Sequence, residues 1–284
     1  MARGAGDVLP AALRYAKALL TRMEAQELGD TLQVLEVAAG RGNDADLWSN
    51  DVVSELCAID TAEGNVSEAS ERLPACSVSR LDPREENPGE LAYRFDLVYC
   101  NPACISNAFK DKKSLSAVAA FLAACALPNG VVCGVCFSGH ELWTRAQKSA
   151  EPSPKVRGPG FSVAFPSRQF KDVGTHFRIR IGDALVPEEH FLPNLQALIR
   201  HMGRCSMRFE GAFSLSELVQ EYSLHSQLSD TFTSLLGEYV SPAGKLPPEA
   251  LDALTLMTVF VFRKPPKRQQ NSSNLKSHPQ NLNS

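Results

Sequence analysis

Residues 32–44 read Leu32-Gln33-Val34-Leu35-Glu36-Val37-Ala38-Ala39-Gly40-Arg41-Gly42-Asn43-Asp44. The apolar run can form a buried parallel strand that ends in an acidic residue. The small residues and two glycines that follow predict a tight turn, and Asn43 and Asp44 are typical helix-starting residues. The stretch therefore predicts a strand, a turn and a helix N-terminus, the beginning of an α/β sheet.

The turn is not a phosphate-binding P-loop, because no Gly-Lys-Ser/Thr sequence follows it. It is not a full dinucleotide fingerprint either, because Ala38 replaces the first glycine. What remains is the looser glycine-rich turn of nucleoside-methionine cofactor sites, where small residues let a ligand approach the backbone. The alternative is a strand that turns into a helix without binding anything.

Further polar residues end the strands predicted after this turn. Glu55–Asp60 is an apolar run that ends in Asp60, about 20 residues on, where a carboxylate can accept hydrogen bonds from a ribose diol. A third strand ends at Asp82, which can bond the exocyclic amine of an adenine, and a fourth runs into Asn101. The alternatives are a solvated loop at Asp60 and a loop residue before Pro83 at Asp82.

Composition narrows the class of protein. The chain has 284 residues, 44% hydrophobic and 21% charged, which suits one large α/β domain or a domain with an insertion. A net charge of -3 gives no overall basic field, so any contact with RNA must come from a local patch. There is no signal-peptide pattern and no run of 18 apolar residues, so we expect an intracellular protein without a membrane span.

The eight cysteines lie mostly in apolar runs, and we expect them to be reduced. Cys133 and Cys136 have a metal-like spacing, and Cys100 with Cys104 could complete a site. Within a strand, however, Cys133 and Cys136 would point to opposite faces, so we expect no metal.

The remaining elements follow from periodicity and turn residues. Helices are expected at residues 9–27, 63–73, 114–126, 191–202 and 214–222, the last with a capping box of Ser214 and Glu217. Strands are expected at 76–82, 95–102, 131–137, 161–165, 175–181, 206–209 and 254–262, with a turn at 127–130 and a surface loop at 151–160. Lys17 is expected on a solvated helix face, and Arg178 and Arg180 point outward from an edge strand.

In this order the pieces resemble the messenger RNA cap guanine-N7 methyltransferases, over roughly residues 13–264. The resemblance is carried by residues 34–44, 59–62, 95–100, 127–130, 186–188 and 254–264. It implies a class I, Rossmann-like methyltransferase fold, with a mainly parallel seven-stranded sheet and helices on both faces. The methyltransferase domain would span residues 1–264, with a cap-pocket insertion near 151–250, and residues 265–284 would form a disordered basic and polar tail.

The resemblance also implies the cofactor S-adenosylmethionine and a set of residues beside it. Ala38 and Gly40 would lie at the turn, Asp60 at the ribose, Asp82 at the adenine and Asn101 near the methionine end. Lys17 matches a lysine that the family places beside the cofactor. Ala38 departs from the family's glycine and Asn101 from its glutamine.

The cap side departs much further. Ile105 and Ser106 replace a His-Tyr pair, Ile181 replaces a glutamate that reads guanine, and Met257 replaces a tyrosine that lines the pocket. Leu13 and Arg14 replace paired asparagines. Each guanine donor left buried and unpaired costs about 1 to 3 kcal/mol. We expect Ile105, Ile181 and Met257 to converge on an apolar wall, so that the guanine pocket is rebuilt or lost.

Three functions stay open at this stage. The first is a methyltransferase of the cap guanine-N7 type that acts on capped RNA in the nucleus or cytoplasm. The second is a non-catalytic relative that acts as a scaffold or regulatory subunit with a partner protein. The third is a methyltransferase with another substrate. Loss of catalytic side chains would not decide among them, because guanine N7 carries no proton for a base to remove.

Overall fold

The computed structural model describes residues 5–48, 51–158, 160–181, 186–222, 229–241 and 245–266. Its main sheet has seven strands in the order β10 (Arg208–Ser214), β11 (Met257–Arg263), β5 (Ala126–Phe137), β4 (Phe95–Cys100), β1 (Leu32–Val37), β2 (Val53–Asp60) and β3 (Ser77–Arg80). The pairings from β5 to β3 are parallel, and β11 runs antiparallel to both β5 and β10. The predicted mainly parallel sheet is confirmed.

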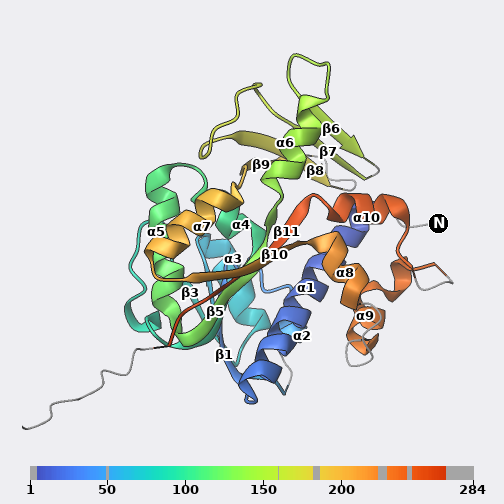
Figure 1. Cartoon of the computed structure of the whole chain (residues 1–284). Helices are drawn as coiled ribbons and strands as arrows, with labels where there is room; N and C mark the ends of the chain where they lie inside the picture. The colour runs from blue at the N-terminus through green and yellow to red at the C-terminus, as the bar shows by residue number, and fades with distance from the viewer. Residues whose placement is uncertain are drawn as a thin grey trace, which may run out of the picture.

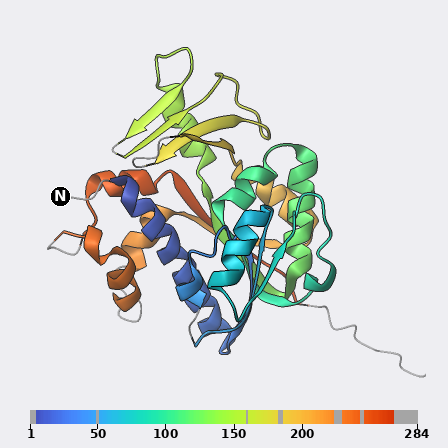
Figure 2. The same ribbon diagram turned by 180° about the vertical axis from the view of Figure 1, so that it is seen from behind.

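Helices cover both faces of this sheet (Figures 1 and 2). The elements are α1 (Ala5–Leu28), α2 (Ala45–Trp48), α3 (Glu63–Arg72), α4 (Pro102–Ala108), α5 (Lys112–Cys125) and α7 (Leu195–Arg204), with a 3-10 turn, η1, at Gly89–Leu91. Tyr15 and Leu19 of α1 pack into one apolar core, whereas Leu115 of α5 and Leu198 of α7 pack into the core on the other face. Strand β1 lies between the two cores, which explains its almost continuous apolar sequence.

A second, antiparallel sheet stands beside the main one (Figure 1). It consists of β6 (Lys155–Gly158), β7 (Phe161–Ala164), β8 (His176–Ile181) and β9 (Glu188–Phe191), and α6 (Gly139–Gln147) leads into it. Two predictions are wrong here. The expected loop at 151–160 contains β6, which forms because Val156 is buried and pairs with Val163. Strand β8 is an inner strand, so Arg178 and Arg180 do not lie on an edge.

The described residues between β10 and β11 form α8 (Leu215–Tyr222), α9 (Ser229–Leu236) and α10 (Pro248–Leu254), with a 3-10 turn, η3, at Gly237–Tyr239. They pack against α1, where the rings of Tyr15 and Phe232 meet edge to face with centroids 5.6 Å apart. The Glu217 half of the predicted capping box is confirmed, whereas the Ser214 hydroxyl bonds the N–H of Ser216 and not that of Glu217. Glu217 accepts the Ser214 N–H at 3.0 Å, and the Ser214 hydroxyl accepts the Ser216 N–H at 3.2 Å.

Several element boundaries differ from the prediction. The helix expected from residue 191 begins at Leu195, because Phe191 belongs to β9 and the Asn194 side chain caps α7 by accepting the Ala197 N–H at 3.2 Å. Leu254 ends α10 instead of starting a strand, and the expected turn at 127–130 lies within β5. The insertion predicted near 151–250 contains the second sheet, α7, β10 and α8–α10. Of the predicted tail, residues 267–284 lie outside the described residues.

All eight cysteines are free, and Cys133 and Cys136 point into opposite cores as predicted. Within the described ranges, no group of three His, Cys, Asp or Glu side chains is arranged to hold a metal ion. Over the same residues, no helix has both the length and the apolar character needed to cross a membrane.

Candidate cofactor and substrate sites

The turn after β1 is tied to the end of β2 by one carboxylate. Asp60 accepts the Gly40 N–H at 2.9 Å on one oxygen, and the Ala62 N–H and the Asn65 amide at 3.0 Å on the other. Asp60 is only 8% exposed. Ala38 adopts a φ of 58°, in the left-handed region where a Cβ costs about 1 to 2 kcal/mol, which explains why glycine suits this position in the family. The turn therefore holds Asp60 rigidly at the carboxyl edge of the sheet.

Ala38, Asp60 and Asp82 line one cavity of about 240 Å³ at the carboxyl ends of β1, β2 and β3. Asp82 accepts hydrogen bonds from the Arg84 guanidinium, at 2.9 Å from Nε and 2.6 Å from Nη2. These bonds lower the pKa of Asp82, so its carboxylate stays an acceptor at neutral pH. The structure thus brings together three of the six residues predicted for the cofactor, and the Gly40 N–H holds one of them.

Lys17 and Asn101 meet around Glu36 instead. The Lys17 ammonium lies 2.5 Å from Glu36 Oε1 and also pairs with Asp44. Glu36 further accepts the Trp48 indole N–H at 2.7 Å and the Asn101 amide at 2.8 Å. This buried cluster lies at the end of β1, on the side toward β4, where the resemblance places the methionine end of the cofactor.

The prediction that Lys17 lies on a solvated helix face is wrong, because the residue is only 1% exposed. Burial alone would lower the pKa of Lys17, but Glu36 and Asp44 hold that pKa above its ordinary value. The Tyr99 ring, with its centroid 5.0 Å from the ammonium, adds to this environment. Lys17 is therefore charged and already paired with two carboxylates of its own chain. Removing one member of such a cluster leaves an uncompensated buried charge.

On the substrate side, Ile181 and Met257 do meet, together with Phe137, Phe161 and Ile179. The space left among these side chains is only about 10 Å³, roughly the size of one water-sized probe. Met257 is 1% exposed and belongs to the core beneath β11. The place where the resemblance puts guanine is therefore filled by apolar side chains.

Ile105 and Ser106 do not join this wall, which corrects the expected convergence. Ile105 on α4 is fully buried in the core on the opposite face of the sheet. The Ser106 hydroxyl accepts the Phe191 N–H at 3.0 Å, donates to the Phe191 carbonyl at 3.1 Å, and lies 3.2 Å from His190 Nδ1. Ser106 thus fixes β9 against α4. Asp183, near the expected reader of guanine, lies outside the described residues.

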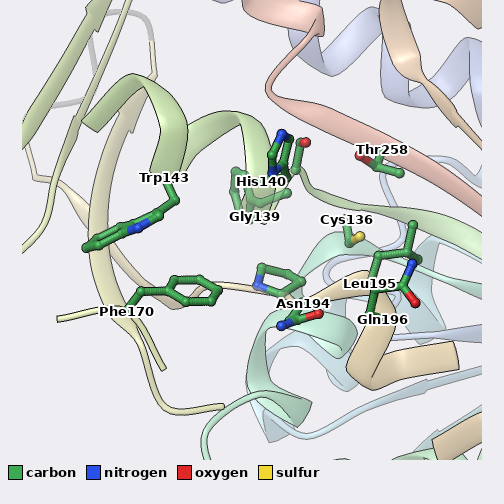
Figure 3. A pocket seen from close by; sticks show the side chains of 12 residues that line it. Cys136, Gly139, His140, Trp143, Phe170, Asn194, Leu195, Gln196 and Thr258 are labelled. Atoms are coloured by element: carbon green, nitrogen blue, oxygen red, sulfur yellow. The ribbon is translucent and has the colours of Figure 1, made fainter. Parts of the chain in front are cut away.

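A larger cavity, about 430 Å³, opens next to the filled place (Figure 3). It lies at the ends of β5 and β11, between α6 and the start of α7. Gly139 lets these helices meet, because a Cβ there would lie 1.8 Å from the Pro193 carbonyl oxygen. Phe137, at the end of β5, lines both spaces, while its neighbour Cys136 and the paired Thr258 line only the larger cavity. The ends of β5 and β11 therefore separate the two spaces.

Sequence reasoning missed Arg84, Asn65, Asp44 and Trp48 as parts of the site. Glu36 is the signal that could have pointed to Trp48, because a carboxylate in an apolar strand needs a buried cation or N–H donors. Arg84 follows Asp82 closely, but its ion pair depends on the loop geometry. The residues of the larger cavity come from separate elements, and no spacing along the chain connects them.

Comparison with known proteins agrees with this architecture. No family model matches the chain. A solved S-adenosylmethionine-dependent methyltransferase from Clostridium acetobutylicum has a TM-score of 0.55 at 13% identity, covering 89% of this chain and 91% of that one. At this identity the likeness concerns the fold, which is the class I, Rossmann-like methyltransferase fold that the sequence predicted.

Two curated plant proteins match along the sequence. The chain is 24% identical over 260 residues to mRNA cap guanine-N(7) methyltransferase 2 of Oryza sativa, covering 82% of this chain and 74% of the relative. It is 23% identical over 258 residues to the protein of the same name in Arabidopsis thaliana, with 82% and 71% covered. The predicted resemblance is confirmed: the chain is a distant relative of the mRNA cap guanine-N7 methyltransferases.

Proposed function

We propose that this chain is an S-adenosylmethionine-dependent methyltransferase that acts on RNA, with the cap guanine-N7 as its acceptor. The observation that carries the proposal is the cavity at the ends of β1–β3, where Asp60 and Asp82 lie together as fixed acceptors. The names of the two plant relatives support the RNA substrate. A role on messenger RNA places the protein in the nucleus or the cytoplasm.

The residues present fit the cofactor. Asp60 has one oxygen with a single intramolecular donor, so it can still accept from a ribose hydroxyl, and Asp82 stays ionised and can accept from the adenine amine. The small side chain of Ala38, on the β1 side, leaves space for a nucleoside beside the strand ends. The cluster around Glu36 would bind the amino-acid end through its carboxylates and the Asn101 amide. When bound, the cofactor supplies a methyl group on a sulfonium, and the protein's part is to orient the acceptor and exclude water.

The apolar side chains at the place expected for guanine restrict which RNA could act as methyl acceptor. Ile181 and Met257 offer no hydrogen-bond partner for the donors of a guanine, and there is no room for the base beside them. We therefore expect free cap dinucleotide to bind weakly or not at all to the isolated chain. Methyl transfer would then require a longer capped RNA or a partner protein that supplies the missing positioning.

The same observation favours a second candidate, a methyltransferase-fold subunit that binds the cofactor without transferring its methyl group. Such a subunit would keep the Asp60 cavity and would need no guanine pocket. A methyltransferase with another substrate is the third reading. It would show methyl transfer that does not depend on the cap.

Calorimetry with S-adenosylmethionine and a methyl-transfer assay separate these readings. We expect binding in the micromolar range, about -7 to -9 kcal/mol, and transfer to a capped RNA but not to the same RNA without its cap. Cofactor binding without transfer, in the presence of capped RNA, would support the subunit. No heat with the cofactor at high protein concentration would overturn both proposals.

A further inference from the structure

The larger cavity is separate from the predicted cofactor cavity, and none of the residues predicted for cofactor or cap lines it. It lies outside the carboxyl ends of the sheet, where open α/β sheets bind ligands. Its volume of about 430 Å³ falls in the range of small-molecule sites. On β11, Met257 faces the filled place while the next residue, Thr258, faces this cavity.

One end of the cavity is aromatic. Trp143 on α6 and Phe170, in the loop between β7 and β8, have ring centroids 5.4 Å apart at an interplanar angle of 38° (Figure 3). Phe165 packs edge to face against the Trp143 ring at 5.2 Å and fixes the indole from behind. Phe170 is 40% exposed, an unusual position for a phenylalanine that only fills a core. Exposed aromatic faces of this kind stack on planar rings.

The remaining wall is largely apolar, with Cys136, Pro193 and Leu195 among its residues, and a few polar side chains interrupt it. His140, Gln196 and Thr258 reach the cavity from three different elements (Figure 3). Within the described part of the chain, none of these three side chains forms a hydrogen bond, and no Asp, Glu, Lys or Arg lines the cavity. A phosphate or an ammonium group would meet no counter-charge here. A neutral planar ring with donors and acceptors on its edge matches both walls.

We infer that this cavity binds an unionised nucleobase of the RNA chain, with the base stacked on Trp143 and Phe170 and its edge bonded by the polar side chains of the remaining wall. The inference rests on the proposed function, because that function makes RNA the ligand at this edge of the sheet. The base lies on the side of β5 and β11 opposite the filled place. It thereby holds the RNA by a contact that the cap itself does not provide.

The test measures RNA affinity, not methyl transfer. A short, fluorescently labelled capped RNA is titrated with the full chain and with Phe170→Ala, while polarisation is recorded. We expect Phe170→Ala to bind at least about fivefold more weakly, the loss for stacking one base, and Phe170→Trp to restore affinity. Phe213→Ala is the matched control, because Phe213 is also exposed, at 47%, but lies on β10 away from the cavity.

Two further measurements make the outcomes separable. Cofactor calorimetry should be the same for Phe170→Ala and the wild type, because Phe170 does not line the Asp60 cavity. The melting temperature should fall only slightly, because Phe170 is 40% exposed and its ring packs on Trp143. Gln196→Leu should weaken RNA binding without reducing stability, since Gln196 is exposed. If the wild-type chain binds RNA and Phe170→Ala binds it equally well, the inference is wrong while the proposed function stands. If the wild-type chain binds no RNA, the proposed RNA function fails and the inference fails with it.

Discussion

The cavity proposed for the cofactor and the filled place where the resemblance puts guanine lie along the same edge of the main sheet. Charged and polar residues line the first, whereas apolar residues fill the second. At the first, carboxylates are held by backbone N–H groups and a guanidinium around an open space of about 240 Å³. At the second, Ile181, Met257 and Phe137 close a space of about 10 Å³. The place proposed for the cofactor is therefore open and polar, whereas the place where the resemblance puts guanine is closed and apolar.

The two regions should also fail differently when they are mutated. Buried charges depend on each partner being present, so the polar side loses stability when one ion is removed. Apolar packing depends on volume, so the filled side loses stability when a cavity is opened. Substitutions on the two sides should therefore give different losses of stability and of binding.

Lys17→Met should destabilise the protein by about 3–5 kcal/mol, because it keeps the bulk but leaves Glu36 and Asp44 without their buried cation. Urea unfolding of the two proteins measures the difference. Lys113→Met is the control, since Lys113 is exposed and should change stability by less than about 0.5 kcal/mol. Equal losses in the two variants would show that the buried cluster contributes nothing specific.

Met257→Ala should cost about 2–5 kcal/mol, because the side chain is almost fully buried and its neighbours can collapse only in part. The same denaturation experiment gives the value, with Met23→Ala, at an exposed methionine of α1, as the comparison. A loss no larger than that of Met23→Ala would mean that the place is not packed, and that a guanine could enter.

Asp60→Ala should weaken S-adenosylmethionine binding by about 1–3 kcal/mol, the range for losing a charge-assisted hydrogen bond. Calorimetry measures the affinity, and Asn65→Ala separates the two roles of Asp60, because it removes one internal donor and keeps the carboxylate. An unchanged affinity in Asp60→Ala would show that Asp60 does not bind the ribose.

Asp82 should make a small contribution to stability that depends on pH. Arg84 lowers the folded-state pKa of Asp82, so the contribution is present above the ordinary value of 3.8 and is lost as the pH falls through the folded-state pKa. We expect the difference between the wild type and Asp82→Asn to be less than about 1 kcal/mol at pH 6. Denaturation repeated in acid should show it vanish, whereas a difference that grows in acid would contradict the ion pair.

Removal of residues 265–284 should have the smallest effect, leaving the melting temperature almost unchanged, because the composition of the segment gives it little apolar surface to bury. Differential scanning calorimetry of the truncated chain tests this. A large drop in melting temperature would show that the segment docks. Weaker RNA binding with a flatter salt dependence would instead identify Lys267, Arg268 and Lys276 as phosphate contacts.

Local signals predicted the sheet and three residues, Ala38, Asp60 and Asp82, that the structure brings to one cavity. In residues 32–37, apolar side chains occupy both alternating sets of positions, because β1 is buried on both faces. This pattern can be read directly from the sequence. Asp60 and Asp82 were found because each follows a strand, and the carboxyl ends of parallel strands share one edge. Helix α4 and strands β6 and β9 were missed, since they are short and depend on pairing with distant segments.

The sequence pattern gave the wrong surroundings for residues whose contacts lie on distant segments of the chain. Lys17 looks like a solvated residue between apolar ones, and only the approach of Glu36 and Asp44 from another part of the chain makes its burial tolerable. Ile105 and Ile181 were expected on one wall, but the sheet lies between them because α4 and β8 pack on different sides.

The class I methyltransferase fold, the glycine-rich turn and the strand-end carboxylates can be predicted from the chain alone, because they depend on periodicity and on residues close along it. The pairing of Lys17 with two carboxylates, the filling of the guanine place and the aromatic cavity beside it become visible only in the folded protein. Packing volume and the pairing of buried charges are set by contacts between distant segments, and such contacts leave no fixed spacing in a single sequence.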